Sequence, residues 1–188
     1  MSVTPPFHSP PIGPSPRVLA FYNAIPSVLW SGVCLVPLVV YCYQHVARPW
    51  VYGALGLSLC GYVVPKTWFR VWQLSPRPAA YHRLGVRIVN LFTQHGALVH
   101  RLLRRRYPHY RLLRGRNGVA ALVAHTYHQE RFHVVGLVYF LLISAYAVGH
   151  GHSGWAVALT LLNGLYNLYP IWLQQYVRVR LGVGASAS

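Results

Sequence analysis

Four long apolar runs limit this chain more than any other feature, because none of them contains a Lys, Arg, Asp or Glu. They cover residues 26–46, 49–65, 132–149 and 155–173. A helix needs about 20 apolar residues to cross the hydrocarbon core of a bilayer, with a lower limit near 17. The first and fourth runs are long enough, and the other two are marginal. We therefore predict an all-α integral membrane protein with four transmembrane helices arranged as two hairpins.

The basic residues lie almost entirely on one side of these runs. The chain has 17 Lys and Arg against a single acidic residue, and 13 of the 17 lie between Lys66 and Arg131. The connections near residues 47–48 and 150–153 hold only Arg48. The positive-inside rule then predicts a multi-pass protein of the cell membrane with both termini in the cytoplasm. Basic soluble proteins that bind nucleic acid lack such apolar runs, so we expect membrane lipid and no nucleic acid as partner.

Composition predicts five segments along the chain. They are a disordered Pro-rich tail (1–17), a first transmembrane hairpin (18–65), a basic cytoplasmic or interfacial helical segment (66–131), a second hairpin (132–176) and a cytoplasmic tail (177–188). Within the basic segment, apolar residues recur at helical spacing from Tyr81 to Leu102 with arginines between them. This pattern predicts one amphipathic helix in the membrane interface, ending before Pro108. It could adhere to anionic headgroups or bind the phosphates of an acyl donor.

The last apolar run carries polar residues three or four positions apart, which on a helix form one stripe. The stripe consists of Thr160, Asn163, Asn167, Pro170, Gln174 and Arg178. Amides that face lipid are costly, so the stripe should face protein or a cavity. Hydrogen bonding between helices and a substrate groove both remain open as its role.

Glu130 is the only acidic residue, and it lies three positions before His133. Residues at this spacing are neighbours on a helix. A carboxylate that accepts from one imidazole nitrogen leaves the other free to take a proton from a hydroxyl. We therefore predict His133 as a general base and Glu130 as its orienting partner, within hydrogen-bond reach or one water of each other. Arg178 and Arg180 should approach the same pocket and hold an anion.

Two other roles for Glu130 remain open. It could pair with Arg131 or cap a helix at the membrane surface, or it could join His125, His128 and His133 as a metal ligand. The chain has no paired histidines of the kind that membrane di-iron enzymes use, so we predict no metal. A Ser-His-Asp triad is excluded because the chain has no Asp.

Several motifs together resemble the glycosyl-4,4'-diaponeurosporenoate acyltransferase family of carotenoid (staphyloxanthin-type) biosynthesis, over roughly residues 66–181. They are Glu130-Arg-Phe-His133, Asn167-Leu-Tyr-Pro170, Gln174-Gln-Tyr176-Val-Arg178-Val-Arg180-Leu181, Tyr81-His-Arg-Leu84-Gly85 and Tyr107-Pro108. The resemblance implies a membrane enzyme that esterifies a sugar hydroxyl of a glycosylated carotenoid acid with a fatty acyl chain. It implies no bound cofactor, with acyl-CoA or an acyl carrier as donor.

The resemblance implies catalytic roles for His133 and Glu130. From the polar stripe, the arginines at the same membrane face and the terminal motif, we predict these substrate-binding residues: Arg131, Asn163, Asn167, Gln174, Tyr176, Arg178 and Arg180. The chain departs from the family pattern at two places: residues 75–80 lack the expected acidic residue, and Val177 replaces an Asn. A non-catalytic protein that binds lipid or scaffolds a biosynthetic complex is therefore the alternative. A scaffold should tolerate Glu130→Gln, whereas a catalyst should not.

Overall fold

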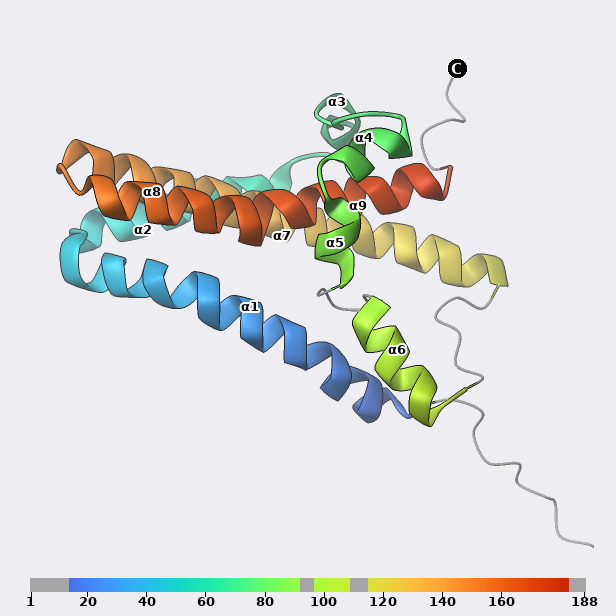
Figure 1. The fold of residues 1–188 in the computed structure, drawn as a ribbon. Coiled ribbons are helices and arrows are strands. Elements are labelled where there is room, and N and C mark those ends of the chain that lie inside the picture. The colour runs from blue at the N-terminus through green and yellow to red at the C-terminus, as the bar shows by residue number, and fades with distance from the viewer. Residues whose placement is uncertain (1–13, 92–96, 109–114, 183–188) are drawn as a thin grey trace, which may run out of the picture.

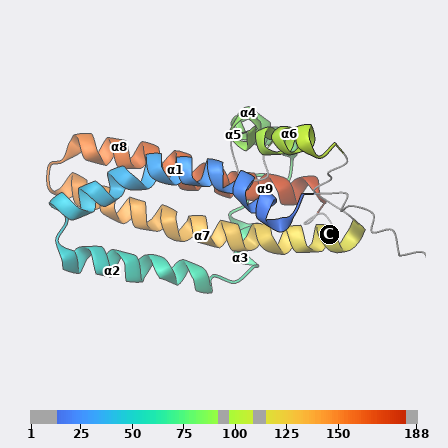
Figure 2. The same ribbon diagram turned by 90° about the horizontal axis from the view of Figure 1, so that it is seen from below.

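The computed structural model describes residues 14–91, 97–108 and 115–182, and every regular element in these ranges is helical. The long helices are α1 (Pro16–His45), α2 (Arg48–Leu59) and α7 (Gly115–Gly149), followed by α8 (Ser153–Asn163) and α9 (Tyr169–Arg180). A 3₁₀ turn, η1 (Cys60–Val63), extends α2, and a π-helical turn, η2 (Gly164–Leu168), joins α8 to α9. These helices run side by side as an elongated bundle (Figures 1 and 2).

The two short connections, 46–47 and 150–152, lie together at one end of the bundle (Figure 1). The Tyr41 hydroxyl of α1 lies 2.9 Å from Nδ1 of His152. The backbone N–H of Ala47 donates to the Tyr146 hydroxyl across 3.4 Å. One contact from each connection thus joins the first pair of helices to the second pair at this end.

Among the described residues, three helices are long and apolar enough to cross a membrane: Pro16–His45, Gly118–Gly149 and Ser153–Arg180. Helix α2 has 12 residues and its 3₁₀ extension 4, so the run 49–65 forms a shorter helical segment than the other three. The all-helical fold is as predicted, and the crossing of a membrane by four spans stays a prediction. Helix α7 also begins well before residue 132, which places Glu130 and His133 inside a helix instead of at its start.

The apolar core lies where α1, α2, α7 and α8 meet. Its buried side chains include Leu38, Tyr41, Phe140, Ile143 and Leu159. A Cβ on Gly61 would lie only 3.1 Å from Val135, so the 3₁₀ turn lies directly on α7. The outer surfaces of the same helices expose large apolar side chains, as a bundle surrounded by lipid should.

The basic segment does not form the single amphipathic helix that the sequence predicted. It forms α3 (Trp68–Val71), α4 (Pro78–Arg83), α5 (Val86–Leu91) and α6 (Ala97–Arg106). Gly85 has a φ of 73° between α4 and α5, a left-handed conformation that ends a helix. The break lets Tyr81 and Val86 pack together with Leu173 and Tyr176 of α9. Helix α6 ends at Arg106, before Pro108, as predicted.

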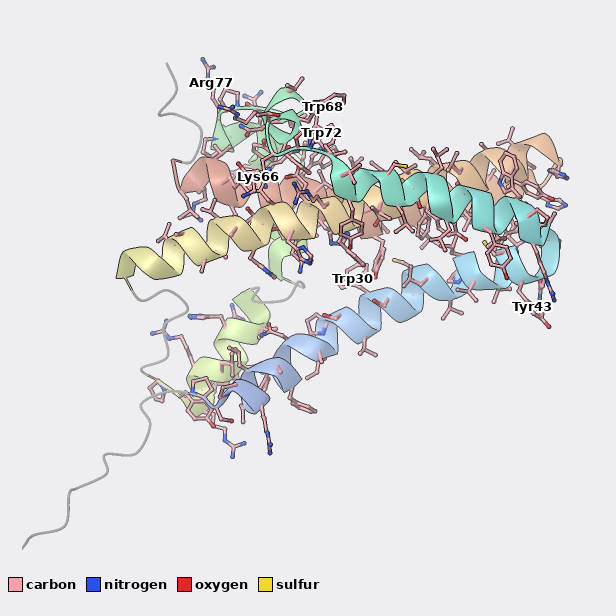
Figure 3. All side chains as sticks on the ribbon, turned by 180° about the vertical axis from the view of Figure 1, so that it is seen from behind. Trp30, Tyr43, Lys66, Trp68, Trp72 and Arg77 are labelled. Atoms are coloured by element: carbon pink, nitrogen blue, oxygen red, sulfur yellow. The ribbon has the colours of Figure 1, made fainter. Side chains whose placement is uncertain are left out.

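Aromatic and basic side chains gather at the end of the bundle away from the short connections. Figure 3 shows Lys66, Trp68, Trp72 and Arg77 together there, and Tyr43 at the opposite end. Trp68 is 58% exposed and Trp72 38% exposed. Exposed tryptophans beside basic residues are typical of the membrane–water interface. The residues around α3 are therefore of the kind found where a membrane meets water.

The π-helical turn changes which residues of α9 face inward. A π turn contains one extra residue, which rotates everything downstream by about 100° relative to an unbroken α-helix. The buried face therefore continues from Asn163 and Asn167 to Gln175, where the sequence pattern predicted Gln174. Of the predicted stripe, the two asparagines and Arg178 are buried, Gln174 is half-buried, and Thr160 is exposed.

We predict that deletion of Leu165, a half-exposed residue of the π turn, leaves the bundle folded. The deletion should convert the turn to regular α-helix and keep both flanks in register. Deletion of Leu141, equally exposed but in the regular part of α7, should turn one buried face outward. Thermal unfolding in detergent should show a fall in Tm of about 5 °C or more for the Leu141 deletion and a much smaller fall for the Leu165 deletion. Equal losses would contradict this account of the π turn.

Candidate functional site

Glu130 forms a fully buried ion pair that joins α7 to α9. Its Oε2 accepts from Nη2 of Arg178, and its Oε1 accepts from Nε2 of Gln175 across 2.9 Å. Arg178 also donates to the Thr126 hydroxyl across 3.4 Å, and its guanidinium lies 4.3 Å from the centre of the Tyr127 ring. Glu130 is 0% exposed and Arg178 only 2%. The predicted approach of Arg178 to Glu130 is confirmed.

Gln175 extends this cluster to the basic segment. Its Oε1 accepts from the backbone N–H of Leu74 at 3.1 Å and from the Tyr81 hydroxyl at 3.4 Å. The same hydroxyl lies 3.0 Å from the carbonyl of Ser75. Burial raises the pKa of Tyr81, which keeps this phenol protonated and able to donate. The stretch that lacks the family's acidic residue is therefore held against α9 by neutral hydrogen bonds.

His133 is hydrogen-bonded to the side-chain amide of Asn167. The orientation of this amide follows from a chain of hydrogen bonds that begins at a backbone carbonyl. The carbonyl of Leu137 can only accept, so the amide nitrogen of Asn163 faces it, 3.1 Å away. Asn163 Oδ1 then accepts from the Asn167 amide nitrogen at 2.8 Å. This leaves Asn167 Oδ1 to face Nδ1 of His133 at 3.4 Å, so Nδ1 carries the proton.

This chain assigns the tautomer of His133. With its proton on Nδ1, the imidazole presents an unprotonated Nε2 that can act as a base. The backbone carbonyl of Tyr166 also lies close to the ring, and the ring of Tyr166 lies 6.0 Å from it, centre to centre. The Tyr166 hydroxyl is 2.9 Å from the Ser31 hydroxyl, which brings α1 to the same place.

None of the described hydrogen bonds joins Glu130 to His133, and a contact between them through one water stays a prediction. Both oxygens of Glu130 are directed to α9, where Gln175 and Arg178 bind them. The two residues lie within one turn of each other on α7, but the amide of Asn167 does the orienting that the sequence assigned to the carboxylate. The physical reason is charge: a buried guanidinium binds a carboxylate far more strongly than a neutral imidazole does.

Gly136 makes the approach of Asn167 to α7 possible. It lies one turn after His133, and a Cβ there would overlap Oδ1 of Asn167. A larger residue would have to displace the side chain of Asn167, which comes from η2. Glycine at this position is therefore part of the geometry that brings Asn167 to His133.

The other predicted site residues take several different places. Arg131 donates to the carbonyl of Val64 at 3.0 Å, so it does not pair with Glu130. Arg180 is exposed and lies 3.4 Å from the Tyr176 hydroxyl, which also contacts Nε2 of His82 at 3.0 Å. Gln174 is half-buried and lies about 100° around α9 from Gln175.

The histidines near Glu130 do not surround it. His125 and His128 are exposed, whereas Glu130 is enclosed by α9. Within the described ranges, no three His, Cys, Asp or Glu side chains are placed so that they could hold a metal ion.

Sequence reasoning missed four residues of this site: Gln175, Thr126, Tyr166 and Ser31. Gln175 could have been found from its spacing of three to Arg178, which places both on one helical face. The contact between Ser31 and Tyr166 joins positions 135 residues apart, so no local sequence pattern predicts it.

We predict that removing one partner of the ion pair destabilises the protein more than removing both. Glu130→Gln leaves the buried guanidinium of Arg178 without a counter-charge, which costs about 3–5 kcal/mol. The double variant Glu130→Gln/Arg178→Met should recover most of the lost Tm, because no unpaired charge remains. Thermal unfolding in detergent measures this. A single variant with an unchanged Tm would show that the pair is not buried as described.

The buried ion pair makes one test that the sequence suggested uninformative. Glu130→Gln was expected to separate a catalyst from a scaffold. Because the substitution leaves Arg178 unpaired in either case, its loss of function would not distinguish the two. His133, which bears no charged partner, is the better residue for that purpose.

Comparison with known proteins gives one match. A family model described as glycosyl-4,4'-diaponeurosporenoate acyltransferase matches residues 65–183. The match is well over half of the chain, and it includes Glu130, His133, Asn167, Gln175 and Arg178, whereas α1 and α2 precede it. No curated protein and no solved structure gives a significant match.

Proposed function

Because the chain belongs to the glycosyl-4,4'-diaponeurosporenoate acyltransferase family, we propose that it transfers a fatty acyl chain to a hydroxyl of a lipid-soluble glycoside. The acceptor would be a lipophilic, glycosyl carotenoid-like molecule, and the donor acyl-CoA or an acyl carrier. The reaction would take place at the cytoplasmic face of the cell membrane, in a multi-pass protein with both termini in the cytoplasm. Family membership supports the reaction class, and the three long apolar helices support the membrane location.

The observation that carries the mechanism is the contact between Nδ1 of His133 and Oδ1 of Asn167, from which the tautomer of His133 is inferred. Its Nδ1–H donates to Asn167, which leaves Nε2 to remove the proton from the acceptor hydroxyl. The resulting oxygen attacks the carbonyl carbon of the acyl thioester and forms the new ester bond. The bond from carbon to sulfur breaks, and the leaving thiolate takes the proton back from Nε2. Protons and electrons balance, and His133 returns to its starting form.

Glu130 would then be a positioning residue, not a base. Its pair with Arg178 holds α9 against α7, and the same contact between helices sets the distance from Asn167 to His133. Asn163 acts one step further away, since it orients the Asn167 amide. All three arginines proposed to bind substrate contact protein groups, and of the three only Arg180 is exposed.

A non-catalytic protein that binds lipid or scaffolds a complex is the second candidate. Two observations favour it. Residues 75–80 carry no acidic side chain, and the only carboxylate of the chain is saturated by Gln175 and Arg178. In that case the polar chain from Leu137 to His133 would serve only to hold the helices together.

We predict that His133→Ala lowers the rate of acyl transfer by about 10²-fold or more, the usual scale for a positioned general base. His125→Ala, at an exposed position of the same helix, is the matched control and should keep full activity. Asn167→Leu should give an intermediate loss, because the imidazole remains while its orientation is released. Ester product from membranes that contain equal amounts of each variant is the measurement.

The same comparison separates the two candidates. If His133→Ala accumulates normally and makes product at the rate of the unchanged protein, His133 is not the base. If membranes with the unchanged protein form no ester from any combination of acyl donor and glycoside acceptor, the scaffold candidate is favoured instead.

We also predict the topology. A cysteine placed at residue 2 or residue 186 should be protected from a membrane-impermeant thiol reagent in intact cells, whereas one at residue 151 should react, because the basic residues cluster on the opposite side. Removal of the native cysteines, Cys34, Cys42 and Cys60, supplies the background. Labelling of residue 2 or residue 186 from outside would overturn the orientation.

A further inference from the structure

The arginines of α6 have no acidic side chain left to neutralise them. Glu130 is the only Asp or Glu of the chain, and Arg178 already binds it in a fully buried pair. The net charge is +16. The exposed basic residues must therefore find their anions outside the protein.

Helix α6 displays its basic residues in a defined arrangement. Val99 and Leu103 are 4% and 1% exposed, so one face of α6 is anchored in the protein. Helix α6 lies beside the beginning of α1 (Figure 1). The other side carries Arg101, Arg104 and Arg105, which with His100 line a pocket of about 460 Å³.

The spacing of these arginines favours a bound anion. Arg101 lies three and four positions before Arg104 and Arg105, so their side chains are neighbours on the helix. Like charges at this spacing destabilise a helix. An anion in the pocket would turn this repulsion into attraction. A guanidinium binds phosphate with two parallel hydrogen bonds, which makes phosphate the anion that three clustered arginines suit best.

We propose that this pocket of α6 is a binding site for phosphate groups at the cytoplasmic membrane interface. The phosphates could belong to the headgroup of an anionic phospholipid or to a soluble nucleotide-containing acyl donor such as coenzyme A. Both present the same chemistry to Arg101, Arg104 and Arg105. The site depends on the geometry of α6 and would exist whether or not the protein transfers acyl groups.

The position of α6 also suits a donor that reaches the candidate site from a distance. Helix α1 passes from α6 near its start to Ser31, which contacts Tyr166 beside His133. From Pro16 to Ser31 this helix rises about 22 Å, at roughly 1.5 Å per residue. A donor with a long flexible arm could keep its phosphates on α6 while its thioester lies near His133. This step, unlike the phosphate site, rests on the proposed function.

The test compares two triple variants of the full-length protein in detergent. Arg101→Gln/Arg104→Gln/Arg105→Gln removes the charges of the pocket. Arg70→Gln/Arg77→Gln/Arg83→Gln removes the same number of exposed charges from α3, α4 and the residues between them. Coenzyme A is one probe, measured by equilibrium binding. Phosphatidylglycerol in mixed micelles is the other, with phosphatidylcholine as its zwitterionic reference.

We expect the α6 variant to weaken binding of at least one probe about tenfold or more, and the control variant to weaken it much less. Binding should also fall as salt is added. Loss of coenzyme A binding identifies the donor as the source of the phosphate, and loss of phosphatidylglycerol binding alone identifies the lipid headgroup. If the triple variant unfolds, Arg104→Gln alone should weaken binding in the same assay.

Two results would overturn the site: no binding of either probe by the unchanged protein, or equal weakening by the α6 variant and the control. Equal weakening would mean that only the overall positive charge attracts the probes. Because binding is measured without turnover, an inactive protein that still binds coenzyme A through α6 would refute the proposed function and leave the phosphate site standing.

Discussion

The buried pair of Glu130 and Arg178 is the interaction on which the rest of the arrangement depends. Taking two charges out of water costs several kcal/mol for each ion, and the attraction between them offsets this only when their remaining hydrogen-bonding groups are satisfied. Gln175 and Thr126 supply those partners, and Tyr127 covers the guanidinium. Breaking any one of these contacts would leave a buried charge or polar group without a partner. Together the contacts therefore hold α9 against α7. Gln175 also accepts hydrogen bonds from Leu74 and Tyr81, which hold this segment against α9.

The second network consists of hydrogen bonds between uncharged groups. The group at one end determines which atom donates and which accepts at every later step. Inside an apolar bundle, an amide without a partner is expensive, so each polar group must match the next. The carbonyl of Leu137 accepts, and the alternation of donor and acceptor then runs through Asn163 and Asn167 to Nδ1 of His133. A backbone carbonyl thereby decides which nitrogen of an imidazole is free. The ion pair holds α9 against α7, and this chain of amides orients the imidazole of His133.

Some parts of this arrangement were accessible from local sequence patterns. Periodicity predicted that Asn163 and Asn167 face protein, and they are buried against α7. The position of Glu130 and of the terminal arginines in adjacent antiparallel helices predicted the approach of Arg178. The amphipathic pattern from Tyr81 to Leu102 failed because Gly85 adopts a left-handed conformation that hydropathy does not record. Gln174 was chosen over Gln175 because a π turn is invisible to a pattern that assumes 3.6 residues per turn.

By itself, the sequence determined the helical and apolar character of the chain, the location of its positive charge and the importance of its single carboxylate. These properties follow from composition and from spacing along one helix, which local physical rules describe. Tertiary structure alone decided which partner each polar group takes: Arg178 and Gln175 for Glu130, Asn167 for His133, and Val64 for Arg131. Partner choice depends on which groups meet in space and on the relative strengths of the competing bonds, and a linear pattern contains neither.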